Sequence, residues 1–429
     1  MHLRMERMRM DVVSDCVLPP AACRDEETLR VFIQTRISPN AWPILSPLLR
    51  RTVLAEGIDL EASRRFAMDA DAMERLVRVF YTRMSRIERV LGFDNAFHRA
   101  LHNHEVLLRL LLLEWPDTTA PPEHIRRAAL CVHPTIDSIA SVVKEALATL
   151  LEMGVPSAVL ARDVLAAAGH DYGHSGGTDR LDPSGTPAPF THEEMAEKHV
   201  APIGLEFGMP VALVLESMAG IRATTFHSRP GRDRIHAATE FERKLTLADI
   251  MGCILPPHLW LTHVGAPVLL EKLPVWRRRL AQLPHELRAI DTQLADANLG
   301  NAERTRLVAE RELLGAEDAR IIKHIEEWFR SERGFFSFIE SARLSTVARA
   351  HELWGDILRE KILLMDRVIE RRDLLEPLVA QGFAFLESYA QLLANAKDIR
   401  DVVASRDIDP RLSEILTMFL PEKLAPTAG

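Results

Sequence analysis

The sequence has few cysteines and no long apolar run, and each absence excludes a class of protein. Its 429 residues include only four cysteines, Cys16, Cys23, Cys131 and Cys253, with no CxxC pair. Such spacing gives no dense disulfide framework, so we expect reduced thiols in a cytoplasmic protein. The apolar stretch Leu107–Leu113 is far shorter than the ~18 residues that cross a bilayer, so no membrane association is expected.

Positive charge is in the minority, and strand-forming segments are scarce. The formal net charge is -8, whereas nucleic-acid binding needs clustered Lys and Arg, so no nucleic-acid partner is expected. Leu, Ala, Glu and Arg dominate, and we predict an all-α fold, a multi-helix bundle. Apolar residues recur at helical spacing in Ala72–Leu91, Ser138–Met153, Glu193–Phe207, Phe241–Ile254 and Leu344–Ile369.

Proline-rich and charged segments suggest how the chain is divided. Pro116–Pro122 contains three prolines in seven residues and cannot lie inside a helix. We interpret it as a linker between an N-terminal helical region, 1–115, and a larger helical domain, 123–429. Within that domain, residues 276–319 are highly charged with Leu at intervals, which predicts an antiparallel helical hairpin. A solvated arm is one interpretation of this hairpin, and an arm that forms a homodimer is the other.

The pair His170-Asp171 is the most informative feature of the chain. It closes a helical run, Val159–Gly169, and is followed by a loop rich in Gly, Pro, Ser and Asp. Neighbouring imidazole and carboxylate groups can bind one divalent cation together. His133 precedes the pair, and Asp249 lies on an otherwise apolar helical surface where a carboxylate is costly to bury without compensation. We therefore expect His133, His170, Asp171 and Asp249 to bind metal.

This ligand set predicts a hydrolytic centre with two divalent cations. Mixed imidazole and carboxylate ligands suit Zn, Mn, Fe or Ni at the first site, and a harder second site suits Mg or Mn. Asp171 would bridge the two cations, which would generate hydroxide near neutral pH to attack a phosphoryl group. His174 and His199 are candidate catalytic residues that orient this nucleophile. Alternatively, both are ordinary polar residues of a loop and a helix surface.

Several segments match a known pattern in order. HDYGHSG at 170–176 has the form HDxxHxG, Ala248-Asp249 follows downstream, and His133 precedes both. Glu197-Lys198-His199 is similar to a Glu-Asn-His-His segment, with Val200 in place of the second His. From about Glu123 to Ser345 the chain thus resembles the class I cyclic-nucleotide phosphodiesterases, a branch of the HD superfamily of metal-dependent phosphohydrolases.

The resemblance implies an all-α catalytic domain, two divalent metal ions and hydrolysis of a 3′,5′-cyclic phosphodiester. Ser331–Phe335 is similar to the Ser-Gln-x-Gly-Phe segment that lines the family's base pocket. Glu332 would therefore contact the substrate and Phe335 would stack on it, unless Phe335 is a core aromatic. Glu332 replaces the family's glutamine, and an ionised glutamate can only accept hydrogen bonds. The family also places a general-acid histidine four residues before its first metal histidine, and Ala129 stands at that position here.

These patterns together predict a metal-dependent phosphohydrolase whose substrate is a small-molecule phosphoester. A phosphodiesterase acting on a cyclic nucleotide or a related phosphoester through a metal-bound hydroxide is the leading hypothesis. A nucleotide phosphatase or other phosphomonoesterase would use the same metals. A helical scaffold that keeps a degenerate metal site is the alternative outside enzymes.

Overall fold

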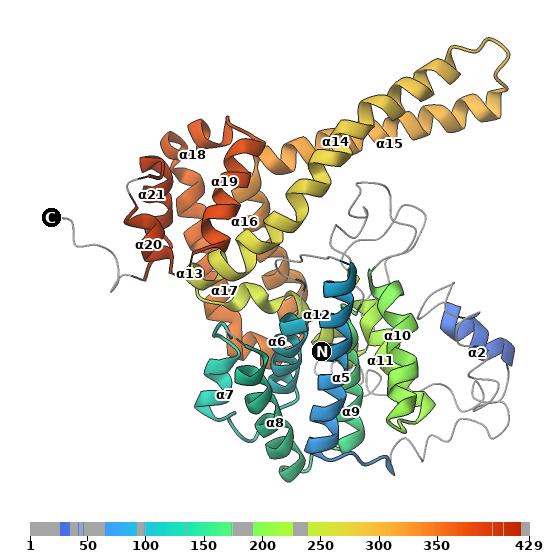
Figure 1. The fold of residues 1–429 in the computed structure, drawn as a ribbon, viewed down its shortest axis with the longest axis vertical. Helices are drawn as coiled ribbons and strands as arrows, with labels where there is room; N and C mark the ends of the chain where they lie inside the picture. The colour runs from blue at the N-terminus through green and yellow to red at the C-terminus, as the bar shows by residue number, and fades with distance from the viewer. Residues whose placement is uncertain are drawn as a thin grey trace, which may run out of the picture.

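All regular structure in the described part of the chain is helical (Figure 1). The computed structural model describes residues 26–34, 42, 46, 65–91, 98, 100–133, 135–172, 174, 192–225, 239–396, 398–405 and 407–421. The prediction of an all-α fold is therefore confirmed over these ranges. The loop expected at 174–190 lies outside them, apart from His174.

The helices follow the predicted apolar patterns to within a few residues. Two patterns are split by a tighter turn, η2 (Met251–Ile254) after α12 and η5 (Leu344–Thr346) before α17. In chain order the α-helices are α2 (Glu26–Phe32), α5 (Ala70–Leu91), α6 (Ala100–Leu113), α7 (Glu123–Ala128), α8 (Ile136–Glu152), α9 (Ser157–Gly169), α10 (His192–Glu206), α11 (Val211–Ala223), α12 (Glu240–Ile250), α13 (Pro257–Trp260), α14 (Ala266–Leu294), α15 (Asn301–Glu326), α16 (Trp328–Phe338), α17 (Ala348–Glu370), α18 (Arg372–Val379), α19 (Phe383–Ala394), α20 (Ile399–Val403) and α21 (Pro410–Thr417).

Helix α9 is the centre of the lower body in Figure 1 and packs against α5, α6, α10 and α11. Nearly all of its side chains are buried, which is typical of a helix surrounded by others. The small residues Ala166, Ala167, Ala168 and Gly169 form its last turn, so neighbouring helices can approach its backbone closely. That turn leads directly into the His-Asp pair.

The Pro116–Pro122 segment is a turn within one core. Helix α6 precedes it and packs against α8 and α9, which follow it. One continuous set of buried apolar side chains includes Leu111 from α6 and Leu147 from α8. Apolar packing is therefore continuous across this segment, because prolines stop a helix without separating the hydrophobic surfaces on either side of it, and the division into 1–115 and 123–429 stays a prediction.

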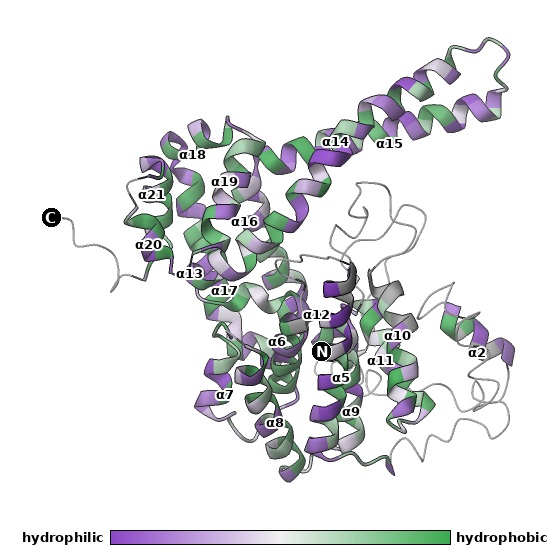
Figure 2. Ribbon diagram, in the orientation of Figure 1, coloured by the Kyte–Doolittle hydropathy of each residue, from purple (hydrophilic) through white to green (hydrophobic). Residues whose placement is uncertain are grey.

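The charged segment forms the predicted hairpin from α14 and α15, which pack side by side and project from the body (Figure 1). The two helices are longer than the predicted segment 276–319, because α14 begins at Ala266 and α15 ends at Glu326. Figure 2 shows polar residues along much of both helices. At its base, the buried Arg279 side chain forms ion pairs with Glu286 and Glu317.

The structure also bears on the cysteines and on membrane spans. Of the four cysteines, the described residues include Cys131, which is exposed, and Cys253, which is buried, and both are free thiols. Among the described helices, none alone combines the length and apolar character of a membrane span. The segments Glu240–Ile254 and Pro257–Leu294 reach that threshold only as a pair, with a bend of 100° between them.

Gly169 tests how closely the helices around α9 must pack. A Cβ at this position would lie 2.5 Å from Val200 Cγ2 and 3.1 Å from Phe80 Cε1. We expect Gly169→Ala to lower the free energy of unfolding by about 1–3 kcal/mol, because α10 would have to shift. Gly334→Ala is the matched control, because a Cβ at that position has no atom within 4 Å of it. Its free energy of unfolding should rise by up to about 1 kcal/mol, since alanine has the higher helix propensity. Chemical denaturation of both variants checks this, and equal effects would argue against a packing constraint.

Candidate metal centre

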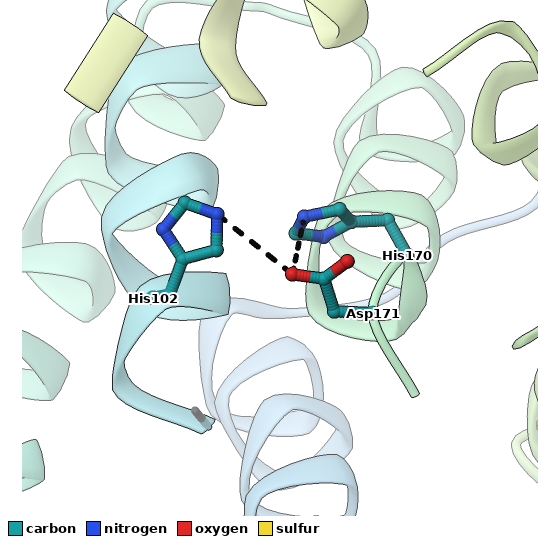
Figure 3. A group of neighbouring side chains, drawn as sticks. All are labelled: His102, His170 and Asp171. Atoms are coloured by element: carbon teal, nitrogen blue, oxygen red, sulfur yellow. Dashed lines mark ion pairs between the residues drawn. The ribbon is translucent and has the colours of Figure 1, made fainter. Parts of the chain in front are cut away.

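Three buried side chains from two helices converge at the end of α9. His102 comes from the first turn of α6, and His170 and Asp171 follow the last residue of α9 (Figure 3). One potential ligand atom from each lies within 4.8 Å of the other two. Nε2 of His170 lies 3.2 Å from Asp171 Oδ2, and Nε2 of His102 lies 3.8 Å from the same oxygen. The geometry is that of a group that could hold a metal ion.

Asp249 adds a second carboxylate from α12. Its Oδ1 lies 3.2 Å from His170 Nε2 and 3.3 Å from His102 Nε2. Burial alone would raise the pKa of Asp249, but the charge of His170 and the hydrogen bonds from both imidazoles outweigh it and lower this pKa to about 2. Asp249 is therefore ionised across the physiological range.

The hydrogen bonds of His170 and Asp171 suit a cation. His170 Nδ1 donates to the carbonyl oxygen of Ala167 at 2.9 Å, which directs the Nε2 lone pair toward the carboxylates. Burial would lower the pKa of His170, but the charges of Asp171 and Asp249 raise it well above its usual value. Oδ2 of Asp171 is buried, which would raise the pKa of this carboxyl, but the ion pair with His170 holds that pKa well below its usual value. A cation at this position would take over the compensation that His170 gives.

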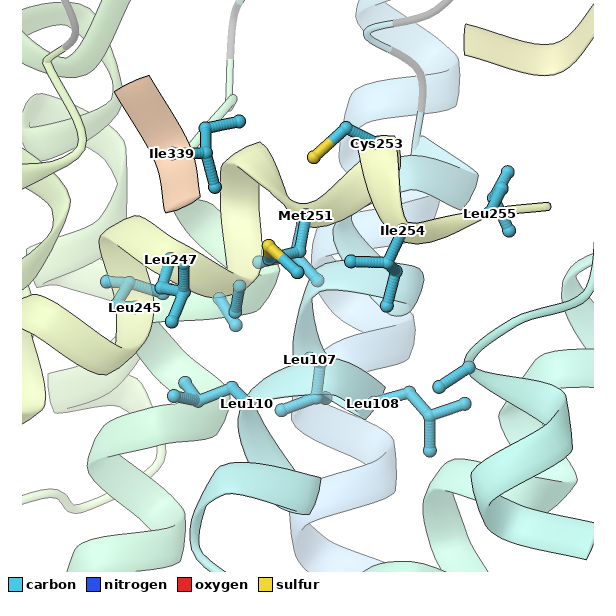
Figure 4. Packing of buried hydrophobic residues seen from close by; sticks show 14 of the residues in the cluster. Leu107, Leu108, Leu110, Leu245, Leu247, Met251, Cys253, Ile254, Leu255 and Ile339 are labelled. Atoms are coloured by element: carbon cyan, nitrogen blue, oxygen red, sulfur yellow. The ribbon is translucent and has the colours of Figure 1, made fainter. Parts of the chain in front are cut away.

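Apolar packing between α6 and α12 keeps His102 and Asp249 facing each other. Figure 4 shows Leu107, Leu108 and Leu110 of α6 lying against buried residues of α12 and η2, among them Met251. These side chains are all fully buried. His102 and Asp249 lie at the edge of this interface, so the hydrophobic contact sets their separation.

The structure brings together three of the four predicted metal ligands, and His102 takes the place expected for His133. His170, Asp171 and Asp249 lie together, as described above. His133 is not part of the group, because its Nε2 donates a 2.8 Å hydrogen bond to the carbonyl oxygen of Ala128 at the end of α7. The histidine in this group is thus His102, before the Pro-rich turn, and not the predicted His133 after it.

A further histidine, His98, was missed by the sequence reasoning. Its Nδ1 donates to Glu271 Oε2 at 2.6 Å, and its backbone N–H donates to Glu271 Oε1 at 3.0 Å. Burial would lower the pKa of His98, but the Glu271 carboxylate raises it to about 9, so the ring is cationic at neutral pH. His98 precedes His102 by four residues. In the resembling family the general-acid histidine precedes the first metal histidine by the same spacing, at which Ala129 precedes His133. The two histidines at this spacing were the signal that could have found both.

The remaining predicted site residues occupy two surroundings. His174 is buried and its ring stacks on that of His98, with centroids 4.2 Å apart. His199 lies on the exposed side of α10 with its ring 4.9 Å from Tyr172, outside the group of metal-ligating atoms. His174 is therefore next to the centre, whereas His199 packs on Tyr172, which follows Asp171 in the chain.

Glu332 and Phe335 lie three residues apart on α16 and are both half-buried. Phe335 packs against Phe336, with ring centroids 6.3 Å apart. Burial raises the pKa of Glu332 to about 7 against the opposing charge of Lys272. At neutral pH this carboxyl is therefore present in both forms, and its protonated form can donate a hydrogen bond. From the sequence alone, Glu332 was expected to act only as an acceptor.

No protein-family model, no curated protein and no solved structure matches this chain. The function must therefore be argued from the chemistry of the site.

Substitutions at His102 and His133 test which histidine binds metal. We expect His102→Ala to weaken binding of Mn²⁺ or Zn²⁺ by more than about tenfold, because it removes a ligand from the buried group. His133→Ala should leave the affinity unchanged, because that imidazole donates to a backbone carbonyl. Titration calorimetry and metal content after desalting measure the effect, with circular dichroism as the check of folding. A loss confined to His133→Ala would restore the original assignment.

Proposed function

We propose that the protein is a metal-dependent phosphohydrolase, and specifically a phosphodiesterase that acts on a cyclic nucleotide or a related phosphoester. The observation that carries the proposal is the convergence of His102, His170, Asp171 and Asp249 from three helices. Two imidazoles and two carboxylates form a donor set of mixed softness that suits a catalytic divalent cation. The order of these residues along the chain and the HDxxHxG motif support the same family of enzymes.

The donor set suggests how cations would be held. His102, His170, Asp171 and Asp249 would bind the first ion, for which Zn, Mn, Fe or Ni is suited. Asp171 has two carboxylate oxygens and would also contact a second ion, Mg or Mn. When bound, such ions activate water as a nucleophile and neutralise charge on the phosphoryl oxygens.

His98 is placed to protonate the leaving group. Glu271 fixes its Nδ1–H, so the proton available for transfer is carried on Nε2. The ring lies edge-on to that of His102, with centroids 5.9 Å apart, which puts the acid beside the metal ligands. His174 stacks on the other side and limits rotation of the His98 ring. His98 thus supplies the function for which Ala129 offered no group.

The substrate would extend from the metal centre toward α16. We assign Phe335 to contact with a flat ring and Glu332 to hydrogen bonding at its edge, as the motif at 331–335 suggests. A carboxyl whose pKa is about 7 can donate or accept near neutral pH, so it can serve the role that glutamine has in the resembling family.

A screen of phosphoesters on metal-loaded protein tests the proposal. We expect hydrolysis of a cyclic nucleotide to a monoester, with loss of at least about a thousandfold in Asp171→Ala, because that residue would hold both proposed ions. Release of inorganic phosphate instead would favour the phosphomonoesterase. Failure to bind Mn²⁺, Zn²⁺ or Mg²⁺, together with no activity on any ester, would leave the non-catalytic scaffold as the better interpretation.

The role of His98 makes a separate prediction about leaving groups. We expect His98→Asn to slow hydrolysis of a cyclic nucleotide by ~10²–10⁴-fold, because an alkoxide leaves poorly without a proton. Bis(p-nitrophenyl) phosphate should be affected far less, since p-nitrophenolate needs no protonation. His124→Asn, at an exposed histidine paired with Glu145, is the matched control. The measurement is kcat for both substrates, and equal losses for the two would argue against an acid role.

A further inference from the structure

The projecting arm carries apolar side chains in solvent. Val308, Leu313 and Ile322 of α15 are 42%, 61% and 41% exposed, whereas some other apolar residues of this helix face inward. Leu307 and Ile321 are buried against the rest of the structure. The inner side of α15 is therefore already covered, and Val308 and Ile322 belong to another side of the helix.

Val308 and Ile322 belong to a regular stripe of residues along α15. Val308, Gly315 and Ile322 are spaced by seven residues, so they lie along one side of α15. Ala319 lies between the last two on the same side, which leaves a shallow centre between two larger ends. Apolar residues repeated every seven positions are the pattern by which one helix packs along another. Leu313 lies on nearly the opposite side of the helix.

Gly315 has no reason within its own chain to be glycine. It lies in the middle of a 26-residue helix, where glycine costs about 1 kcal/mol relative to alanine. A Cβ there would meet no atom within 4 Å, and its backbone needs no positive φ. Glycine in a helix also permits the close approach of another backbone, which would account for it here.

We propose that this side of α15 pairs with the same side of α15 in a second copy of the chain, antiparallel about a two-fold axis at Gly315. The stripe is self-complementary about that point, because Val308 and Ile322 are each seven residues from it. Val308 then packs on Ile322 of the partner subunit, and the reverse contact is equivalent, as a two-fold interface requires. The two backbones approach most closely at the glycines.

Charge along the edge of the stripe fits this pairing. Arg311 and Asp318 flank the same edge at almost equal distances from Gly315. In the antiparallel arrangement, Arg311 faces Asp318 of the partner subunit, while it keeps its ion pair with Asp291 of its own arm. The projection of the arm from the body leaves room for two arms to cross (Figure 1).

The mass of the full-length protein in solution tests the proposal. We expect sedimentation equilibrium to show a dimer, and the double variant Val308→Glu, Ile322→Glu to dissociate at least about tenfold more readily. Leu313→Glu adds the same kind of charge on the other side of α15 and should remain dimeric. A monomeric parent protein, or a dimer that the double variant leaves intact, would overturn the proposal. Circular dichroism establishes that each variant is folded.

The position of the two-fold axis gives an independent test. A cysteine on the axis lies next to its own copy in the partner, so we expect Gly315→Cys to form disulfide-linked dimers when treated with oxidised glutathione. Leu313→Cys points away from the axis and should form no more than the parent, which carries only the native cysteines. Equal cross-linking at both positions, or none at Gly315→Cys, would contradict the arrangement. Neither test depends on catalytic activity, so failure here is distinct from failure of the proposed function.

Discussion

The site depends on the burial of α6 between α9 and α12. Ionised carboxylates are costly to remove from water unless cations or hydrogen bonds compensate them. Asp171 and Asp249 are nevertheless held close to one another, because the leucines of α6 pack beneath both helices that carry them. The packing of α6 thus forces the two carboxylates to be buried together, at a cost in free energy. His102 and His170 lie where they offset it, so the core and the charged centre form one arrangement.

Protons and metal ions can compensate this cluster in the same places. The Nε2 atom of His170 binds a proton when it pairs with Asp171, and the same lone pair would bind a cation. Its other nitrogen is fixed by Ala167, so exchange of proton for metal needs no change of ring orientation. This explains how a strongly raised pKa at His170 is compatible with a ligand role.

The sequence predicted the helical class and much of the site for identifiable reasons. His170-Asp171 closes a small-residue helix and Asp249 lies on an apolar helix, so local pattern alone pointed to both. The first histidine could not be chosen in this way, because His102 and His133 flank the Pro-rich turn and each begins a helical stretch. Only the packing of α6 on α9 separates them. His98 could not be identified for the same reason, because the position four residues before His133 is Ala129.

Tertiary contacts also changed the interpretation of single groups. The carboxyl of Glu332 was assigned as an ionised acceptor from its type, whereas its burial raises its pKa to about 7. The sequence predicted the hairpin from its charge and leucine spacing. Which side of α15 is covered and which faces solvent follows only from the packing of α14 against it.

Helix α14 links the arm to the candidate metal centre. Glu271 lies in its second turn and holds His98 through two hydrogen bonds, while Arg279 anchors its further course to α15 by the ion pair with Glu317. α14 also packs against α19, so its first half is fixed by the body and its second half by the hairpin. The orientation of the proposed acid therefore rests on a helix whose direction is set outside the site. A hairpin that was only a solvent-exposed arm would not need the buried ion pairs of Arg279. A helix that must position Glu271 benefits when the part of it that follows Glu271 is held rigidly.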